Sequence, residues 1–145
     1  MGCADRGGTP SRFIEPFEQW LDRGIGSCLL RDRENRQIVE SALLFFDGDR
    51  YQLGTFVLMP NHVHVLFRPL GKHALSGIVQ SWKRHTARQI NQRENRTGTA
   101  LWQPEYFDRL IRSQEHFAYV ESYIRKNPKQ LASDEFTLYS PPSES

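Results

Sequence analysis

The chain of 145 residues contains few of the features that place a protein in a class at once. It has only two cysteines, Cys3 and Cys28, which show neither the close spacing of a zinc site nor the density of a disulfide framework. They are expected to be reduced structural thiols. No apolar run is long enough to span a membrane, and no signal peptide is evident. We therefore expect a cytoplasmic protein that does not interact with membranes.

The composition is that of a folded domain with an uneven charge distribution. A hydrophobic content of 38% with nine Phe argues against disorder, and the length suits one domain with a buried core. The net charge is +2, but residues 1–67 carry −2, residues 68–130 carry +7 and residues 131–145 carry −3. The basic segment favours a polyanionic partner, although a solvated helix face would have the same composition.

Hydrophobic spacing and turn residues predict the order of the elements. Helical spacing is found in four segments: residues 13–21, 32–46, 74–92 and 113–126. Apolar runs bounded by turn residues predict three strands: residues 51–58, 62–68 and 106–111. The tail from Ser133 is polar and is expected to fray. The predicted order is α-α-β-β-α-β-α, without repeats and without a second domain.

Two histidines that are two residues apart, His62 and His64, are the most informative feature of the chain. Residues i and i+2 of a strand point to the same face, so the two imidazoles are expected side by side. Neutral imidazole is a common metal ligand, and this pair could supply half of a coordination sphere. The alternative is two ordinary strand histidines that are hydrogen-bonded or exposed.

The last predicted helix carries a row of polar side chains. Tyr119, Tyr123 and Asn127 are spaced by four residues and share one helical face. The neighbouring apolar stripe would pack on a sheet and consists of Phe117, Val120 and Ile124. From spacing alone, Tyr123 could equally be a packing residue and Asn127 a residue of the helix terminus.

Four blocks of the sequence together resemble a known family. In chain order they are LMPNHVHVLFRPL, SWKRHTARQIN, LWQPEYFDRLIR and YIRKNP. Over residues 25–131 the chain resembles the HUH single-tyrosine transposases of bacterial insertion sequences, and in particular the REP-associated tyrosine transposases. The resemblance implies metal-dependent cleavage and rejoining of DNA strands through a phosphotyrosine intermediate.

The resemblance also implies roles for single residues. It makes Tyr123 the nucleophile, and it makes His62, His64 and Asn127 ligands of a divalent metal. Imidazole with oxygen ligands suits Mn²⁺, and Mg²⁺ suits the site if water and phosphate complete the coordination. A tyrosyl phosphate ester is a covalent intermediate that the released 3′-OH can attack later, so strands rejoin without ATP.

The substrate implied by the resemblance is single-stranded DNA or a short hairpin with adjacent single-stranded bases. The residues expected to contact it are Lys83, Arg84, Arg88, Trp102, Arg109 and Arg112. The cations would neutralise phosphates, whereas Trp102 and Tyr106 would stack on bases. Trp102 could also belong to the core, as is expected of Trp82. We expect a monomer or a homodimer.

The fold that the resemblance implies is α+β: a ferredoxin-like antiparallel sheet with helices on one face and a C-terminal helix that carries the tyrosine. The chain departs from this pattern at its start, because MGCADRGGTPS is rich in Gly, Pro and charge and has no strand signal. The first strand is therefore expected to be missing. We divide the chain into an N-terminal segment with a short helix (1–24), an HUH transposase-like domain (25–131) and a polar tail (132–145).

Two further functions compete with the metal-dependent DNA transesterase. A missing strand would favour a non-catalytic hairpin-DNA-binding protein, derived from a decayed or domesticated transposase. The intact set of His62, His64, Tyr123 and Asn127 favours the enzyme. A metal-dependent hydrolase of small phosphates is the third reading, and it would need neither a basic segment nor a tyrosine.

Overall fold

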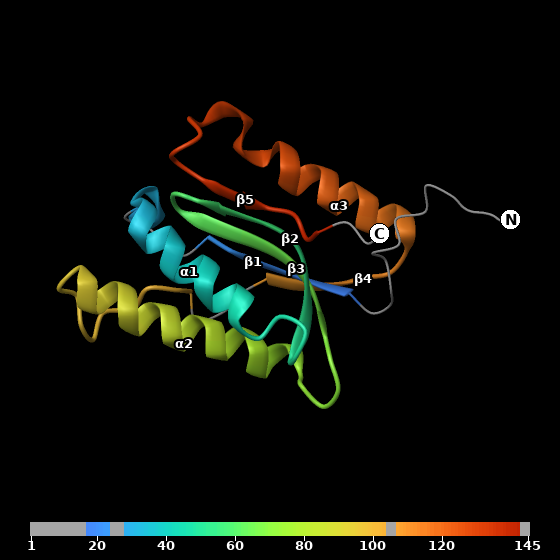
Figure 1. Cartoon of the computed structure of the whole chain (residues 1–145), viewed down its shortest axis with the longest axis horizontal. Helices are drawn as coiled ribbons and strands as arrows, with labels where there is room; N and C mark the ends of the chain where they lie inside the picture. The colour runs from blue at the N-terminus through green and yellow to red at the C-terminus, as the bar shows by residue number, and fades with distance from the viewer. Residues whose placement is uncertain (1–16, 24–27, 104–106, 143–145) are drawn as a thin grey trace, which may run out of the picture.

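The computed structural model describes residues 17–23, 28–103 and 107–142, with the backbone alone for 107–109. A five-stranded antiparallel sheet lies between two helical layers (Figure 1). Its strands are β1 (Phe17–Asp22), β2 (Tyr51–Met59), β3 (His62–Pro69), β4 (Phe107–Ile111) and β5 (Thr137–Tyr139), in the spatial order β4-β1-β3-β2-β5. The helices are α1 (Arg33–Phe45), α2 (Leu75–Arg93) and α3 (Gln114–Lys126), with 3-10 turns at Leu29–Arg31 and Asn127–Gln130.

The two faces of the sheet bury two separate hydrophobic clusters. The larger cluster lies under α1 and α2 and includes Trp20, Leu43 and Trp82. The smaller one lies under α3 and includes Phe17, Leu66 and Ile124. The α+β class and the antiparallel sheet are therefore confirmed, with α1 and α2 on one face and α3 on the other (Figure 1).

The prediction of a missing first strand is wrong. Residues 17–22, where a helix was predicted, form the interior strand β1, which pairs with β3 on one side and β4 on the other. Residues 13–16 of that prediction lie outside the described part of the chain. Phe17, Trp20 and Leu21 fit helical spacing by coincidence: β1 is covered on both faces, so it lacks the polar alternation of a half-exposed strand.

The polar tail does not fray where it was expected to do so. Residues 137–139 form β5, which pairs with β2 at the edge of the sheet. The ring of Tyr139 stacks on Phe56 at 4.8 Å between centroids. The buried Arg36 of α1 donates to Oγ1 of Thr137 and to the carbonyl of Asp134. These contacts were invisible to the prediction because each joins the tail to a residue far away in sequence.

The other predicted elements are found within one or two residues of their expected bounds. Ser113 caps α3 by accepting a hydrogen bond from the N–H of His116. Asp32 caps α1 in the same way through the N–H of Glu34. In the described segments, no helix combines the length and the apolar character that crossing a bilayer requires. The proposed division at residues 24 and 131 stays a prediction.

Candidate active site between strand β3 and helix α3

His62 and His64 lie on the face of β3 that α3 covers. Leu66 continues the same face and packs in the hydrophobic cluster under α3, which fixes the direction of both histidines. His64 is 4% exposed, whereas His62 is partly exposed at the start of the strand. The structure therefore brings the two imidazoles to one face of the sheet, as their spacing predicted.

His64 makes a contact that sequence analysis missed. Its Nε2 lies 2.8 Å from Oε1 of Gln19, a residue of β1 that is itself 5% exposed. The Nδ1 atom of His64 is buried and has no hydrogen-bond partner in the described part of the chain. When Nε2 carries the proton and donates it to Gln19, Nδ1 keeps a free lone pair. The only signal for Gln19 would have been the pairing of β1 with β3, which the prediction lacked.

Both histidines are held in the neutral form. Burial, with smaller contributions from the nearby His62 and Arg23, lowers the pKa of His64 to about 4. Burial also lowers the pKa of His62, with a smaller contribution from Arg23. Neutral imidazoles are the form that binds metal ions, so no proton has to leave before a ligand can bind near pH 7.

Tyr123 reaches this site from α3. Phe117, Val120 and Ile124 of the same helix are buried against the sheet, which leaves Tyr123 at the edge of the buried stripe with 46% of its surface exposed. Its ring centroid lies 6.1 Å from that of His64. Tyr119, one turn earlier, is 70% exposed. A phenol and a neutral imidazole from elements far apart in sequence thus lie side by side.

A buried polar contact joins α3 to the sheet. Oγ1 of Thr55, a buried residue of β2, donates to Oε2 of Glu121 at 2.8 Å. Arg125 lies 3.4 Å from the same carboxylate. Asn127 follows Tyr123 by one turn, is partly buried, and is the C-terminal cap of α3. The bond from Thr55 therefore ties α3 to β2 two residues before Tyr123.

The residues expected to contact DNA fall into two groups. Arg84, Arg88 and Arg112 are exposed, so each is free to meet a phosphate. Arg109 lies in β4 with its side chain outside the described atoms, and Tyr106 lies outside the described residues altogether.

Lys83 and Trp102 were assigned wrongly, because both are buried. The ammonium group of Lys83 donates to the carbonyl of Gln103 and lies 4.0 Å from the fully buried carboxylate of Asp22. Trp102 is 7% exposed and donates its indole N–H to Oγ1 of Thr86. Lys83 compensates a buried charge and Trp102 fills the core, so neither side chain is available to DNA.

The model of the IS200-like transposases matches residues 30–127, which is more than half of the chain. The chain belongs to the IS200-like transposase family. Histidines 62 and 64 and Tyr123 all lie within the matched range. No curated protein sequence matched the chain.

Two solved structures share the fold of this transposase. One is a REP-associated tyrosine transposase bound to a REP hairpin, at a TM-score of 0.62 and 22% identity. That match covers 79% of this chain and 66% of the other, so this chain spans slightly less than two thirds of it. The second is a candidate transposase from Deinococcus radiodurans R1, at a TM-score of 0.53 and 19% identity, covering 84% and 97% of the two chains.

The donor groups around His64 fit a divalent metal only if further oxygen ligands complete its coordination. Among the described residues, no three His, Cys, Asp or Glu side chains form a cluster that could hold an ion. Two neutral imidazoles are present on one face, and the buried Nδ1 of His64 has no partner. The remaining ligands would have to be amide oxygens, water or phosphate, which is the coordination that Mg²⁺ and Mn²⁺ accept.

Proposed function

We propose that this transposase cleaves and rejoins DNA strands through Tyr123. The observation that carries the proposal is the placement of the Tyr123 ring 6.1 Å from the ring of His64, on the face of the sheet where both histidines lie. The phenolic oxygen would attack the phosphorus of a phosphodiester, forming a tyrosyl phosphate ester while the bond to the 3′ oxygen breaks. That oxygen takes a proton and leaves as a 3′-OH. In the reverse step a 3′-OH attacks the ester, and the proton returns to Tyr123.

In this proposal His62, His64 and Asn127 hold Mg²⁺ or Mn²⁺. A bound divalent ion would polarise the scissile phosphate and stabilise the charge on its oxygens. Gln19 is a positioning residue, because accepting the Nε2 proton of His64 fixes both the orientation of the ring and the nitrogen that bears the lone pair. Arg23 is exposed beside the histidines and supplies positive charge where a phosphate would approach.

The proposed substrate is single-stranded or hairpin DNA. Membership of a transposase family supports DNA as the substrate, and the exposed Arg84, Arg88 and Arg112 provide cations for its phosphates. The solved structure of a REP-associated tyrosine transposase was obtained with a REP hairpin, which makes a hairpin the first probe to use. The cytoplasmic location and the monomeric or dimeric state stay predictions.

The alternative of a non-catalytic hairpin-binding protein has lost its main argument. It rested on a missing first strand, but β1 is present and pairs with β3 over Glu18 to Asp22. The hydrolase of small phosphates is likewise not favoured by any observed feature, since the exposed arginines and Tyr123 would have no role in it.

The test is the formation of a covalent protein–DNA adduct. Hairpin DNA with a single-stranded extension and a label at the 5′-phosphate side is incubated with the protein and Mn²⁺, then denatured in detergent. We expect a labelled protein band that Tyr123→Phe abolishes, because this change keeps the ring and removes only the attacking oxygen. Tyr119→Phe is the matched control on the same helical face and should still form the adduct.

Two other results would contradict the proposal. An adduct that survives Tyr123→Phe and is lost in Tyr119→Phe would place the nucleophile one turn earlier. A protein that binds the hairpin tightly but forms no adduct with any divalent ion would instead be the non-catalytic binder.

A further inference from the structure

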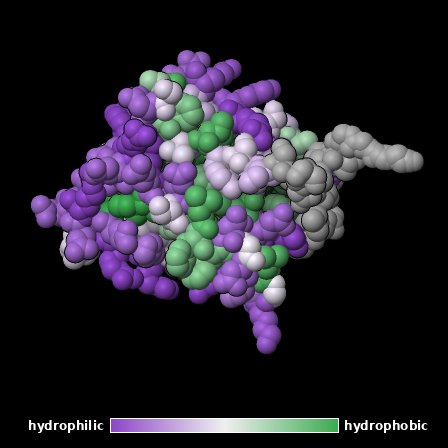
Figure 2. Space-filling model, in the orientation of Figure 1, coloured by the Kyte–Doolittle hydropathy of each residue, from purple (hydrophilic) through white to green (hydrophobic). Residues whose placement is uncertain are grey.

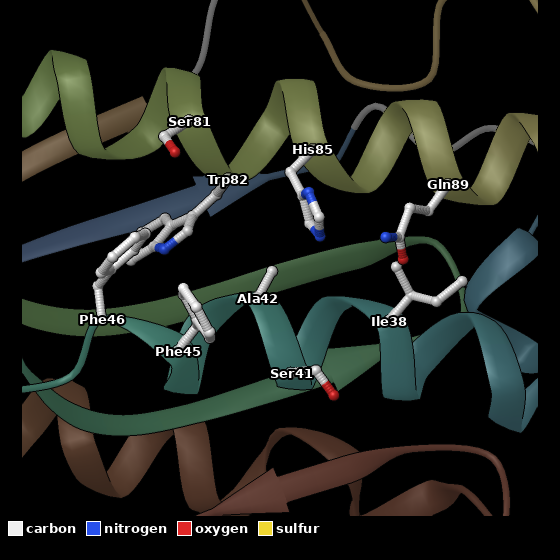
Figure 3. A pocket seen from close by; sticks show the side chains of 9 residues that line it. All are labelled: Ile38, Ser41, Ala42, Phe45, Phe46, Ser81, Trp82, His85 and Gln89. Carbon is white, nitrogen blue, oxygen red and sulfur yellow. The ribbon is translucent and has the colours of Figure 1, made fainter.

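A pocket of about 340 Å³ lies between α1 and α2, in the helical layer on the opposite face from His64. Its volume is within the range of about 300–1,000 Å³ that small-molecule sites occupy. Ser81, His85 and Gln89 are spaced by four residues and form the α2 side of the pocket. His85 and Gln89 point from α2 toward α1, as Figure 3 shows. The α2 wall therefore offers hydrogen-bonding groups to whatever lies in the pocket.

The α1 side of the pocket is aromatic and unusually exposed. Phe45 is 76% exposed and meets the ring of Phe46 edge to face at 4.6 Å. Trp82 lies deeper at 4% exposure, and its indole N–H donates to the hydroxyl of Tyr51. Trp82 thus presents ring carbon to the pocket while its polar atom is already satisfied. Phe45 contributes little to the core, so its place at the mouth of the pocket has no explanation in folding.

Positive charge lies next to the rim of the pocket. Arg84 and Arg88 are exposed on α2 and directly precede His85 and Gln89 of the pocket wall, but neither lines the pocket, and Arg88 lines a separate hollow beside Asn91. The guanidinium carbon of Arg50 lies 3.5 Å from the ring centroid of Phe46. The nearest acidic residues of α1 face elsewhere: Glu34 pairs with Arg93, and Glu40 lines a different cavity beside Arg36. A partner for this rim should be anionic, and a partner for its floor should be flat and apolar.

We propose that this pocket binds an unpaired base of a nucleic-acid strand. The base stacks on Phe45, its edge meets His85 and Gln89, and the flanking phosphates contact Arg84 and Arg88. Exposed aromatics beside a basic stripe are the usual means of holding single strands, because every base has a stacking face. An apolar protein surface docked in the same place would desolvate Arg84 and Arg88 without giving either charge an anionic partner. The inference rests on the proposed function and adds a binding site to it.

This base is a different one from the nucleotide that reacts. The pocket lies under α1 and α2, whereas His64 and Tyr123 lie on the face covered by α3. The pocket therefore anchors a single-stranded extension while the strand to be cut lies at Tyr123. Loss of the pocket should weaken binding of the extension without removing the nucleophile.

The test compares the full chain with Phe45→Ala, using fluorescence anisotropy on a hairpin with and without a single-stranded extension. Stacking of one base predicts that Phe45→Ala weakens binding of the extended hairpin about fivefold or more. The blunt hairpin should bind equally well to both proteins. Leu44→Ala is the matched control, because Leu44 is also exposed on α1 but does not line the pocket. Phe45→Trp should retain the affinity of the parent protein.

A second measurement locates the base directly. An extension that carries 5-iodouracil is irradiated on the protein, and the cross-linked peptide is identified by mass spectrometry. We expect cross-links within the segments that hold Phe45 or His85. Equal affinities of Phe45→Ala and Leu44→Ala, or cross-links elsewhere alone, would overturn the base pocket. If adduct formation at Tyr123 persists in that case, the proposed function stands. If the parent protein neither binds DNA nor forms an adduct, both proposals fail.

Discussion

At the residue scale, the site divides into a part that the sequence predicted and a part that it could not. The i, i+2 spacing of His62 and His64 placed both on one face of a strand, and the structure agrees. Gln19 contacts His64 across β1 and β3 from 45 positions away, so only the strand register reveals it. Lys83 and Trp102 were misjudged for the same reason, since their burial depends on Asp22 and Thr86.

Gln19 provides the first prediction. Gln19→Leu keeps the approximate volume of the side chain but removes the oxygen that lies 2.8 Å from Nε2 of His64. Loss of such an orienting partner typically weakens metal binding about 10- to 100-fold, so we expect Mn²⁺ affinity to fall within that range. Isothermal titration of the DNA-free protein with Mn²⁺ measures it. Gln19→Glu keeps an acceptor oxygen and should retain Mn²⁺ binding. If Gln19→Leu binds Mn²⁺ as tightly as the parent protein does, Gln19 has no positioning role.

The second prediction concerns the pH dependence of stability. Burial holds the pKa of His64 near 4, below the ordinary value of 6.5, so the unfolded chain binds this proton more readily than the folded one. The free energy of unfolding should therefore decrease as the pH falls from about 6.5 to 4, by about 3 kcal/mol from this residue. Urea unfolding in EDTA across this range measures the slope. His64→Gln removes the titrating group, and an unchanged slope in that variant would contradict the assignment.

At the element scale, the prediction succeeded for the three amphipathic helices and for β2 and β3, whose apolar runs are bounded by turn residues, and it failed for β1 and β5. The helices α1, α2 and α3 show helical spacing because water covers one side of each. The interior strand β1 has Phe17 buried toward α3 and Trp20 buried toward α2, so it lacks the polar alternation of a half-exposed strand, and its short apolar spacing resembles that of a helix. The same strand brings Gln19 to the candidate active site. An error in a single element thus concealed one contact of the candidate site.

The third prediction tests the weight of β1 in the fold. Trp20 is 1% exposed and lies 5.5 Å from the ring of Trp82 and 5.4 Å from that of Trp102. Trp20→Ala removes this packing from the centre of the sheet, so we expect the free energy of unfolding to fall by about 3–5 kcal/mol. Chemical denaturation measures the change. Phe45→Ala, which truncates an exposed aromatic ring, should change it by less than about 0.5 kcal/mol. Similar losses in both variants would mean that β1 does not organise the core.

At the scale of the whole molecule, the sheet separates the proposed catalytic residues from the proposed base pocket. Tyr123 and the histidines lie on the α3 face, and the pocket bordered by Arg84 and Arg88 lies on the α1 and α2 face. Figure 2, which views the molecule as in Figure 1, shows apolar surface near the middle of the molecule with hydrophilic side chains around it. The net charge of +7 in residues 68–130 spans both helical layers, since it includes cations of α2 and of α3. A nucleic acid that neutralises this charge must therefore contact more than one face.

The fourth prediction follows from this arrangement. If Arg84 and Arg88 each contact a phosphate, replacing both with Ala removes two released counterions from the binding equilibrium. The slope of log affinity against log salt should then become shallower by about 1.4–1.8, since each contact contributes about 0.7 on single strands and 0.9 on duplex DNA. Anisotropy titrations of the extended hairpin at several salt concentrations give this slope.

The double variant of Arg31 and Arg33 removes the same charge from the start of α1, where Arg31 pairs with Glu135 instead of bordering the pocket. A long-range effect of net charge would change both slopes equally, whereas phosphate contacts at the pocket rim would change only the first. An unchanged slope for Arg84 and Arg88 would mean that they form a solvated helix face, and the anchoring role of the α1 and α2 layer would then have to be abandoned.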